Sequence, residues 1–222
     1  MSKIWVTSDL HLFHKNILNL EKDSLKNNNL SHIKTLEEYN EMVIKRINSR
    51  VRQEDTLYIL GDFCFGGTDK VKEALPKIKG HKILIMGNHD KLTKAQYLSL
   101  GFDDVKKGAY YLPESNGKII MSHYPLLDAY NNPYISYCLH GHLHNSKLDL
   151  DNFMNVNIAL NNYYPIDLDR LLKKTSKDRF EKFGKEWYFC HQVFFNKNRT
   201  DLKLGLNGKV IEMIKKEGEE EK

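Results

Sequence analysis

Residues 83–90 read Ile-Leu-Ile-Met-Gly-Asn-His-Asp, an apolar run that passes directly into a glycine and three polar residues. The run is short and rich in branched side chains, which predicts a buried β-strand. Glycine lets the chain turn sharply at the end of the strand, so Asn88, His89 and Asp90 are expected at its tip. These residues also favour ordinary turns, but their chemistry predicts a functional site at the edge of a sheet.

The same arrangement recurs along the chain. Apolar runs that predict strands lie at Ile4–Thr7, Leu57–Leu60, Ile119–Met121, Tyr137–Leu139 and Val156–Leu160. Four of them are followed by polar motifs, which are Asp9-Leu10-His11, Gly61-Asp62, Ser122-His123 and Gly141-His142-Leu143-His144. Asp, Asn and His are side chains that bind divalent metal ions. The repeated placement therefore predicts a metal site built from several strand ends.

Each motif suggests how its side chains share the ions. Residues two apart in a strand face the same side, so Asp9 and His11 are expected to bind one ion together. The two oxygens of Asp62 allow it to bridge two ions, and His142 and His144 can address two adjacent ions. His140 continues this spacing but is expected behind the ligands or in the core, since the following glycine breaks the strand.

Helices are predicted between the strands. Thr35-Leu36-Glu37-Glu38 is a capping-box pattern that begins an amphipathic helix running to Val51. Further helices are expected over Lys70–Leu75 and Lys94–Leu100, whereas Lys22–Ser31 is interpreted as an inserted polar loop. Strands that alternate with helices indicate an α/β fold.

Composition sets broad limits. A chain of 222 residues fits one domain, and the formal net charge of +5 permits a phosphate ligand or nucleic acid without arguing for either. The three cysteines are widely spaced and form neither a disulfide framework nor a CxxC motif. No apolar stretch resembles a signal peptide or a membrane anchor. A cytoplasmic protein without membrane contact is expected.

The composition changes near residue 173. We expect a catalytic domain over residues 1–174 and an extension over residues 175–222. Aromatic segments and the Asn207-Gly208 turn predict three extra strands over Glu186–Ile214. This appendage is expected to pack on the core or on a second subunit of a homodimer.

The five motifs together resemble the calcineurin-like metallophosphoesterase superfamily, whose pattern is D-x-H, G-D, G-N-H-[DE], H and G-H-x-H. All five elements are present between Asp9 and His144. Residues Ser8–Ile17, the helix after Thr35, Ser122–Pro125 and Asn155–Leu172 also resemble a small subgroup of bacterial and phage-type phosphoesterases. The resemblance implies a four-layer α/β/β/α sandwich with the site at the carboxyl ends of its strands. The inserted loop and the extension do not match this compact pattern.

The resemblance also implies a two-metal site, in which a water or hydroxide between the ions attacks phosphorus in line. Mn²⁺ is favoured, with Fe, Ni²⁺ or Zn²⁺ as alternatives. His89 is implied to act on the leaving group or the phosphoryl oxygens, and Asp90 to orient the His89 ring. The first ion is implied to bind Asp9, His11, Asp62 and His144. The second is implied to bind Asp62, Asn88, His123 and His142.

Three neighbouring residues are weaker candidates for substrate contact: His14 and Asn16 near the first motif, and Tyr124 beside His123. Each is equally explained as a loop or packing residue. Phe63, Cys64 and Phe65 are expected to pack beneath the site. The predicted activity is hydrolysis of a small, nucleotide-like phosphodiester. A phosphomonoesterase, a DNA or RNA nuclease, and a metal-bound scaffold without turnover are the alternatives. The intact Asn88-His89-Asp90 argues against a scaffold, and the absence of a basic cluster argues against a nuclease.

Overall fold

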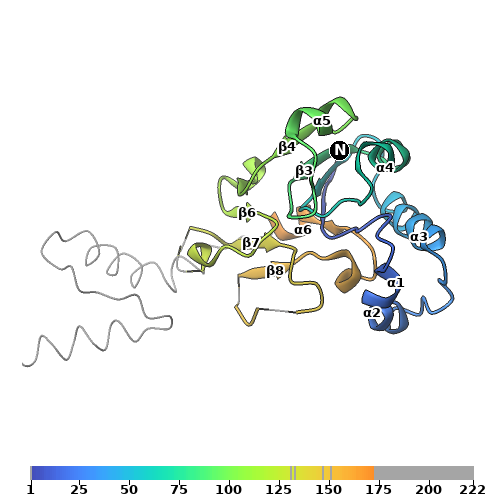
Figure 1. Cartoon of the computed structure of the whole chain (residues 1–222). Helices are drawn as coiled ribbons and strands as arrows, with labels where there is room; N and C mark the ends of the chain where they lie inside the picture. Colours follow the sequence, from blue (N-terminus) through green and yellow to red (C-terminus); the bar gives the residue numbers. More distant parts are fainter. Residues whose placement is uncertain (1, 131, 133, 147, 151, 173–222) are drawn as a thin grey trace, which may run out of the picture.

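The structure is a computed structural model that describes residues 2–130, 132, 134–146, 148–150 and 152–172 (Figure 1). The extension over residues 175–222, with its three predicted strands, lies outside the described residues. The account that follows concerns the described part of the chain.

The first sheet holds the strands that lead into the first three motifs. Its order is β4-β3-β2-β1-β9, with β1 to β4 parallel and β9 antiparallel to β1. Because parallel strands end at the same edge, the residues after β1, β2 and β3 come together there. The strands are β1 (Ile4–Thr7), β2 (Thr56–Ile59), β3 (His81–Ile85), β4 (Asp104–Lys106) and β9 (Ile166–Asp167).

The second sheet carries the two histidine motifs. Its order is β5-β6-β7-β8, with β6, β7 and β8 parallel and β5 antiparallel to β6. His123 follows β6, and the Gly141–His144 segment follows β7. The strands are β5 (Tyr110–Tyr111), β6 (Ile119–Met121), β7 (Tyr137–His140) and β8 (Phe153–Asn155).

The two sheets pack face to face. Val6, Tyr58 and Ile85 of the first sheet share one buried apolar cluster with Met121 and Leu139 of the second. Helices α3 (Leu36–Asn48) and α4 (Gly67–Ala74) lie against the outer face of the first sheet (Figure 1). The outer face of the second sheet is covered by a short segment around the 3₁₀ turn η3 (Leu127–Ala129). The expected α/β sandwich is therefore confirmed.

Local sequence explains where the helices begin. Thr35 and Glu38 form the predicted capping box of α3, and Thr93 and Gln96 form another at the start of α5 (Lys94–Ser99). The remaining helical elements are short. They are α1 (Ile17–Leu20), α2 (Lys22–Asn27), α6 (Leu168–Leu172), η1 (Leu75–Lys77), η2 (Pro113–Ser115) and η4 (Ile158–Asn161). In the described ranges no helix has both the length and the apolar character needed to cross a bilayer.

Two sequence predictions were wrong. The supposed loop Lys22–Ser31 contains α2, because Leu25 and Leu30 are buried in the core and give this polar stretch an apolar anchor. The run Val156–Leu160 is not a strand. Asn157 caps the turn that follows, since its side-chain oxygen accepts a hydrogen bond from the Ala159 N–H at 2.8 Å, and the chain continues as η4. The strand in this region is β8, which ends just before.

Candidate metal centre

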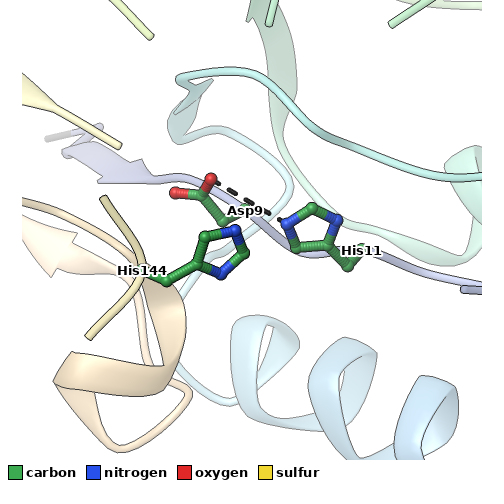
Figure 2. A group of neighbouring side chains, drawn as sticks. All are labelled: Asp9, His11 and His144. Atoms are coloured by element: carbon green, nitrogen blue, oxygen red, sulfur yellow. Dashed lines mark ion pairs between the residues drawn. The ribbon is translucent and has the colours of Figure 1, made fainter. Parts of the chain in front are cut away.

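The seven residues predicted to bind metal all lie in the loops after β1, β2, β3, β6 and β7. Two groups of them are close enough to hold an ion. One is Asp9, His11 and His144, which converge in Figure 2, and the other is Asp9, Asp62 and His123; within each group the ligand atoms lie within 4.8 Å of one another. The structure thus gathers side chains that are up to 135 positions apart, from Asp9 to His144.

His11 shows the clearest sign of a cation site. Its side chain is buried, and neither ring nitrogen has a hydrogen-bond partner. Its Nε2 lies 4.0 Å from Oδ1 of Asp9 and 3.9 Å from Oδ2 of Asp62. Burial, with further contributions from neighbouring histidines, lowers the pKa of His11 to about 3, so the ring is neutral. A buried imidazole with an unused lone pair beside two carboxylates fits a metal ligand.

The two carboxylates lead to the same conclusion. Asp9 and Asp62 are buried, and their ion pairs in the described part of the chain are with histidines alone. Burial raises the pKa of Asp9, while the hydrogen bond from Ser8 and the nearby His123 oppose that rise. Buried carboxylates are costly unless positive charge compensates them. A divalent ion supplies that charge.

Asn88 lies at the centre of a further convergence. Its Oδ1 is 2.8 Å from Nε2 of His123 and 3.1 Å from Nδ1 of His142. Nδ1 of His123 lies 2.9 Å from the carbonyl oxygen of Leu60, which can only accept, so Nδ1 carries a proton and Nε2 is the nitrogen that faces Asn88. The same Nε2 is 3.5 Å from Oδ2 of Asp62. Nitrogen and oxygen lone pairs that point at one spot form a donor set suited to borderline divalent metals.

The backbone of the site is unusual, because five of the seven residues have left-handed conformations. These are Asp9, His11, Asp62, His142 and His144, with φ of 55°, 45°, 55°, 66° and 46°. Asp9 and His11 do converge, but the expectation that they lie in a strand was wrong, since β1 ends at Thr7. Instead, their N–H groups donate to the carbonyls of Gly61 and Asp62 at 3.0 Å, which joins the first two loops.

Three glycines allow the loops to approach one another. A β-carbon at Gly61 would lie 2.4 Å from Nδ1 of His123, and one at Gly87 would lie 2.5 Å from Oδ1 of Asp62. At Gly141 it would lie 2.4 Å from Oδ2 of Asp9. The sequence suggested only that glycine helps the chain turn. The structure shows that it also makes room for the neighbouring candidate ligands.

His89 and Asp90 differ in their surroundings. His89 is exposed at the mouth of the site, with its backbone N–H donating to Oδ1 of Asp62 at 2.9 Å and its ring 4.9 Å from that of Phe65. Asp90 is buried and accepts backbone hydrogen bonds from Asp62, Phe63 and Gly87 at 2.9, 3.1 and 2.8 Å. The idea that Asp90 orients the His89 ring was wrong, because its carboxylate is turned inward to these backbone donors.

The three weaker candidates lie in different places. Tyr124 is 47% exposed, and its ring centre is 4.4 Å from that of His142, so it borders the site. The His14 ring is 5.9 Å from that of His11, and burial, followed by His89, lowers its pKa. Asn16 precedes α1, but its side chain makes no capping hydrogen bond to that helix. Instead, its Oδ1 accepts a hydrogen bond from Nδ2 of Asn19 at 2.6 Å. None of the contacts described for Asn16 reaches the metal ligands.

Two residues at the site were missed by the sequence analysis. Phe65 was expected only to pack beneath the site, yet its ring lies 5.5, 4.4 and 4.9 Å from those of His11, His14 and His89. Its position three residues after Asp62 was the available signal. Glu21 is buried beside His144, but it lies in a polar stretch that gave no signal. His140 is in the core as expected, with Nδ1 2.9 Å from the Gly141 carbonyl oxygen.

Comparisons with known proteins identify the family of the chain. The chain is 30% identical over 189 residues to the uncharacterized protein MJ1445 of Methanocaldococcus jannaschii, covering 81% of this chain and 94% of that protein. It is 39% identical over 93 residues to the Gene 66 protein of Mycobacterium phage L5, a match that spans 41% of the phage protein. The fold is similar to the solved structure of AQ665 from Aquifex aeolicus, a protein of unknown function, with a TM-score of 0.62 and 27% identity. The match covers 79% of this chain and 100% of that structure. The family profile for calcineurin-like phosphoesterases matches residues 2–204, and the chain therefore belongs to that family.

Proposed function

We propose that this protein is a two-metal phosphodiesterase that hydrolyses small, nucleotide-like substrates. The observation that carries the proposal is the buried, unpartnered imidazole of His11 between the carboxylates of Asp9 and Asp62. When bound, divalent ions lower the pKa of water and neutralise phosphoryl oxygens. Mn²⁺ is the favoured ion, with Fe, Ni²⁺ or Zn²⁺ as alternatives. One ion is assigned to Asp9, His11, Asp62 and His144, and the other to Asp62, Asn88, His123 and His142.

His89 is the proposed proton donor. Its ring is exposed at the mouth of the site, and its backbone N–H is fixed to Asp62, so the ring can approach a substrate without serving as a ligand. Phe65 packs against the ring and limits its motion. An imidazole in this position can protonate the departing oxygen or stabilise charge on the phosphoryl group.

Aromatic side chains on two sides of the site support a diester. Tyr124 lies beside His123 and His142, with ring centres 5.0 and 4.4 Å away. Phe65 and His14 lie beside His11 and His89. A monoester has one organic group on phosphorus, whereas a diester has two. One group could lie against Tyr124 and the other against Phe65. Exposed rings such as Tyr124 can stack on a planar base.

A cavity of about 200 Å³ adjoins His89. Phe65, Leu92 and Tyr97 are among its apolar lining residues, and Lys91 contributes the one lysine of that lining. Pockets that enclose whole drug-sized ligands measure roughly 300–1,000 Å³, so this cavity fits a single ring. We assign it to the leaving alcohol, because a group protonated by His89 departs on the side that His89 lines.

The cytoplasm is the proposed compartment. Cys64 and Cys138 are buried free thiols, and burial raises the pKa of Cys64 to about 12 and that of Cys138 to about 11. Such thiols are unreactive and fit a reducing environment, where disulfides are uncommon.

A turnover screen with Mn²⁺ tests the proposal. The substrates are bis-p-nitrophenyl phosphate, p-nitrophenyl phosphate, cyclic nucleotides and single-stranded DNA, each with and without a chelator. We expect chelator-sensitive turnover that is fastest with a diester. Faster turnover of the monoester or of DNA would move the assignment to a phosphatase or a nuclease. Mn²⁺ binding without turnover of any substrate would favour the scaffold alternative.

A further inference from the structure

The junction of α1 and α2 brings a buried carboxylate to His144. Glu21 is 3% exposed, and its Oε1 lies 3.7 Å from Nδ1 of His144, while its Oε2 is buried without a hydrogen-bond partner. The backbone of Glu21 belongs to both helices, since its N–H donates to Ile17 and its carbonyl accepts from Leu25, each at 2.8 Å. These backbone hydrogen bonds hold Glu21 in place, with its carboxylate beside the ring of His144.

Polar contacts hold this segment against the loop that carries His144. The hydroxyl of Ser24 donates to Oδ1 of Asn145 at 3.0 Å, which joins α2 to the residue after His144. On the other side, Nδ2 of Asn155 donates to the carbonyl of His144 at 3.0 Å. The position of His144 relative to Glu21 is thus set from both directions.

A purely stabilising role does not explain Glu21. Within the part of the chain that the structure describes, its ion pair is with His144, and it has no lysine or arginine partner. Burying a carboxylate with one oxygen unpaired costs free energy, and an apolar or amide side chain would avoid that cost. A residue of this kind is better explained by what it does to its neighbour.

We propose that Glu21 is a positioning residue that prepares His144 to bind a metal ion. Its carboxylate lies 3.7 Å from Nδ1 of His144 and favours a proton on that nitrogen, which leaves the Nε2 lone pair for the ion shared with Asp9 and His11. Carboxylates behind ligating histidines act in this way, and their loss commonly lowers metal affinity about 10–100-fold. The inference rests on the proposed metal site and extends it to a segment outside the five motifs.

The test is calorimetric titration of Mn²⁺ into the Glu21→Gln variant and the parent protein. The amide keeps the size of the side chain but is neutral and a weaker acceptor. We expect one of the two binding events to weaken about 10–100-fold while the other is unchanged. Asp23→Asn, which removes a carboxylate from an exposed position two residues away, serves as the control and should bind as the parent does. The melting temperature of the metal-free Glu21→Gln variant should equal or exceed that of the metal-free parent.

A second measurement needs no variant. Long-range ¹H–¹⁵N NMR of the metal-free parent should show the proton of His144 on Nδ1. Wild-type Mn²⁺ affinity at both sites of Glu21→Gln, or a neutral His144 ring that carries its proton on Nε2, would overturn the role of Glu21 and leave the proposed function intact. Failure of the parent itself to bind Mn²⁺ would instead overturn the metal site, and this inference with it.

Discussion

The carboxylate of Asp90 accepts the backbone N–H of Asp62 at 2.9 Å, so the proposed bridging ligand is held by an acid from the next loop. The same carboxylate accepts N–H groups from Phe63 and Gly87. In return, Oδ1 of Asp62 accepts the N–H of His89 at 2.9 Å. The loops after β2 and β3 are therefore joined in both directions, beneath the site rather than within it.

Replacement of Asp90 by Asn should destabilise the protein. An amide offers one acceptor oxygen, and its NH₂ group would face backbone N–H donors, so buried donors are left unpaired. We expect a loss of about 1–3 kcal/mol in the free energy of unfolding, together with reduced turnover. Urea unfolding at pH 7 measures the first effect. The Glu41→Gln variant on the exposed side of α3 is the control, and equal stability of the two variants would contradict the role of Asp90.

Replacement of Asp62 by Asn should weaken both metal sites, because Asp62 is the one residue assigned to both ions. We expect less than two equivalents of Mn²⁺ after dialysis, and at least a tenfold loss of turnover. Elemental analysis of the purified protein measures occupancy. Full double occupancy in this variant would show that Asp62 does not bridge.

Replacement of His89 by Asn should separate metal binding from turnover. We expect Mn²⁺ content to stay at the parent level while turnover falls about 10²–10⁴-fold, the usual range for a general acid. The loss should be smaller for p-nitrophenyl esters than for alkyl esters, since a good leaving group needs less protonation. Equal losses for both kinds of ester would restrict His89 to electrostatic stabilisation.

Replacement of Gly141 by Ala should disturb Asp9. The added carbon would lie 2.4 Å from Oδ2 of Asp9 and 2.6 Å from the hydroxyl oxygen of Ser8, so the carboxylate must move. We expect weaker Mn²⁺ binding by at least tenfold in calorimetric titration. Gly108→Ala is the control for a glycine replacement without a clash, because its β-carbon meets no atom within 4 Å, although its φ of +74° adds backbone strain that Gly141 does not have. Similar binding losses in both variants would show that the clash with Asp9 is not the cause.

Asp55 should contribute stability that depends on pH. Burial raises the pKa of Asp55, but hydrogen bonds from the N–H groups of Arg52 and Lys3 and from the indole of Trp5, at 2.9, 2.8 and 3.0 Å, outweigh it and hold the pKa below its usual value. The stabilisation is therefore present above the unfolded-state pKa of about 3.9 and is lost as the pH falls through the lower, folded-state value.

The test is the Asp55→Asn variant, followed by urea unfolding between pH 7 and pH 2.5. We expect it to be about 1–3 kcal/mol less stable than the parent at pH 7, with the difference narrowing below pH 4. Metal binding should be unaffected at neutral pH, because Asp55 lies at the opposite end of β2 from Asp62. A stability difference that is constant with pH would contradict the ionised role of Asp55.

Much of the sheet arrangement and the convergence of the candidate ligands could be predicted, because each candidate follows an apolar run that forms a strand. Asn88 and His123 illustrate this, since strand and motif are adjacent in the sequence. The predictions failed where a single contact decides the local structure. Val156–Leu160 has the composition of a strand, but the side chain of Asn157 caps a 3₁₀ turn there. The role of Glu21 depends on a residue 123 positions away, and no local pattern encodes such a contact.

The left-handed backbone at Asp9, His11, Asp62, His142 and His144 has a consequence for protein engineering. Each such conformation costs a non-glycine residue about 1–3 kcal/mol, and glycine adopts it without that cost. A library screened for heat resistance alone would therefore enrich glycine at these five positions, and each enriched clone would lose a proposed metal ligand. Screens on this protein need a selection for catalysis in the same round, because the most accessible gains in melting temperature lie where they abolish activity.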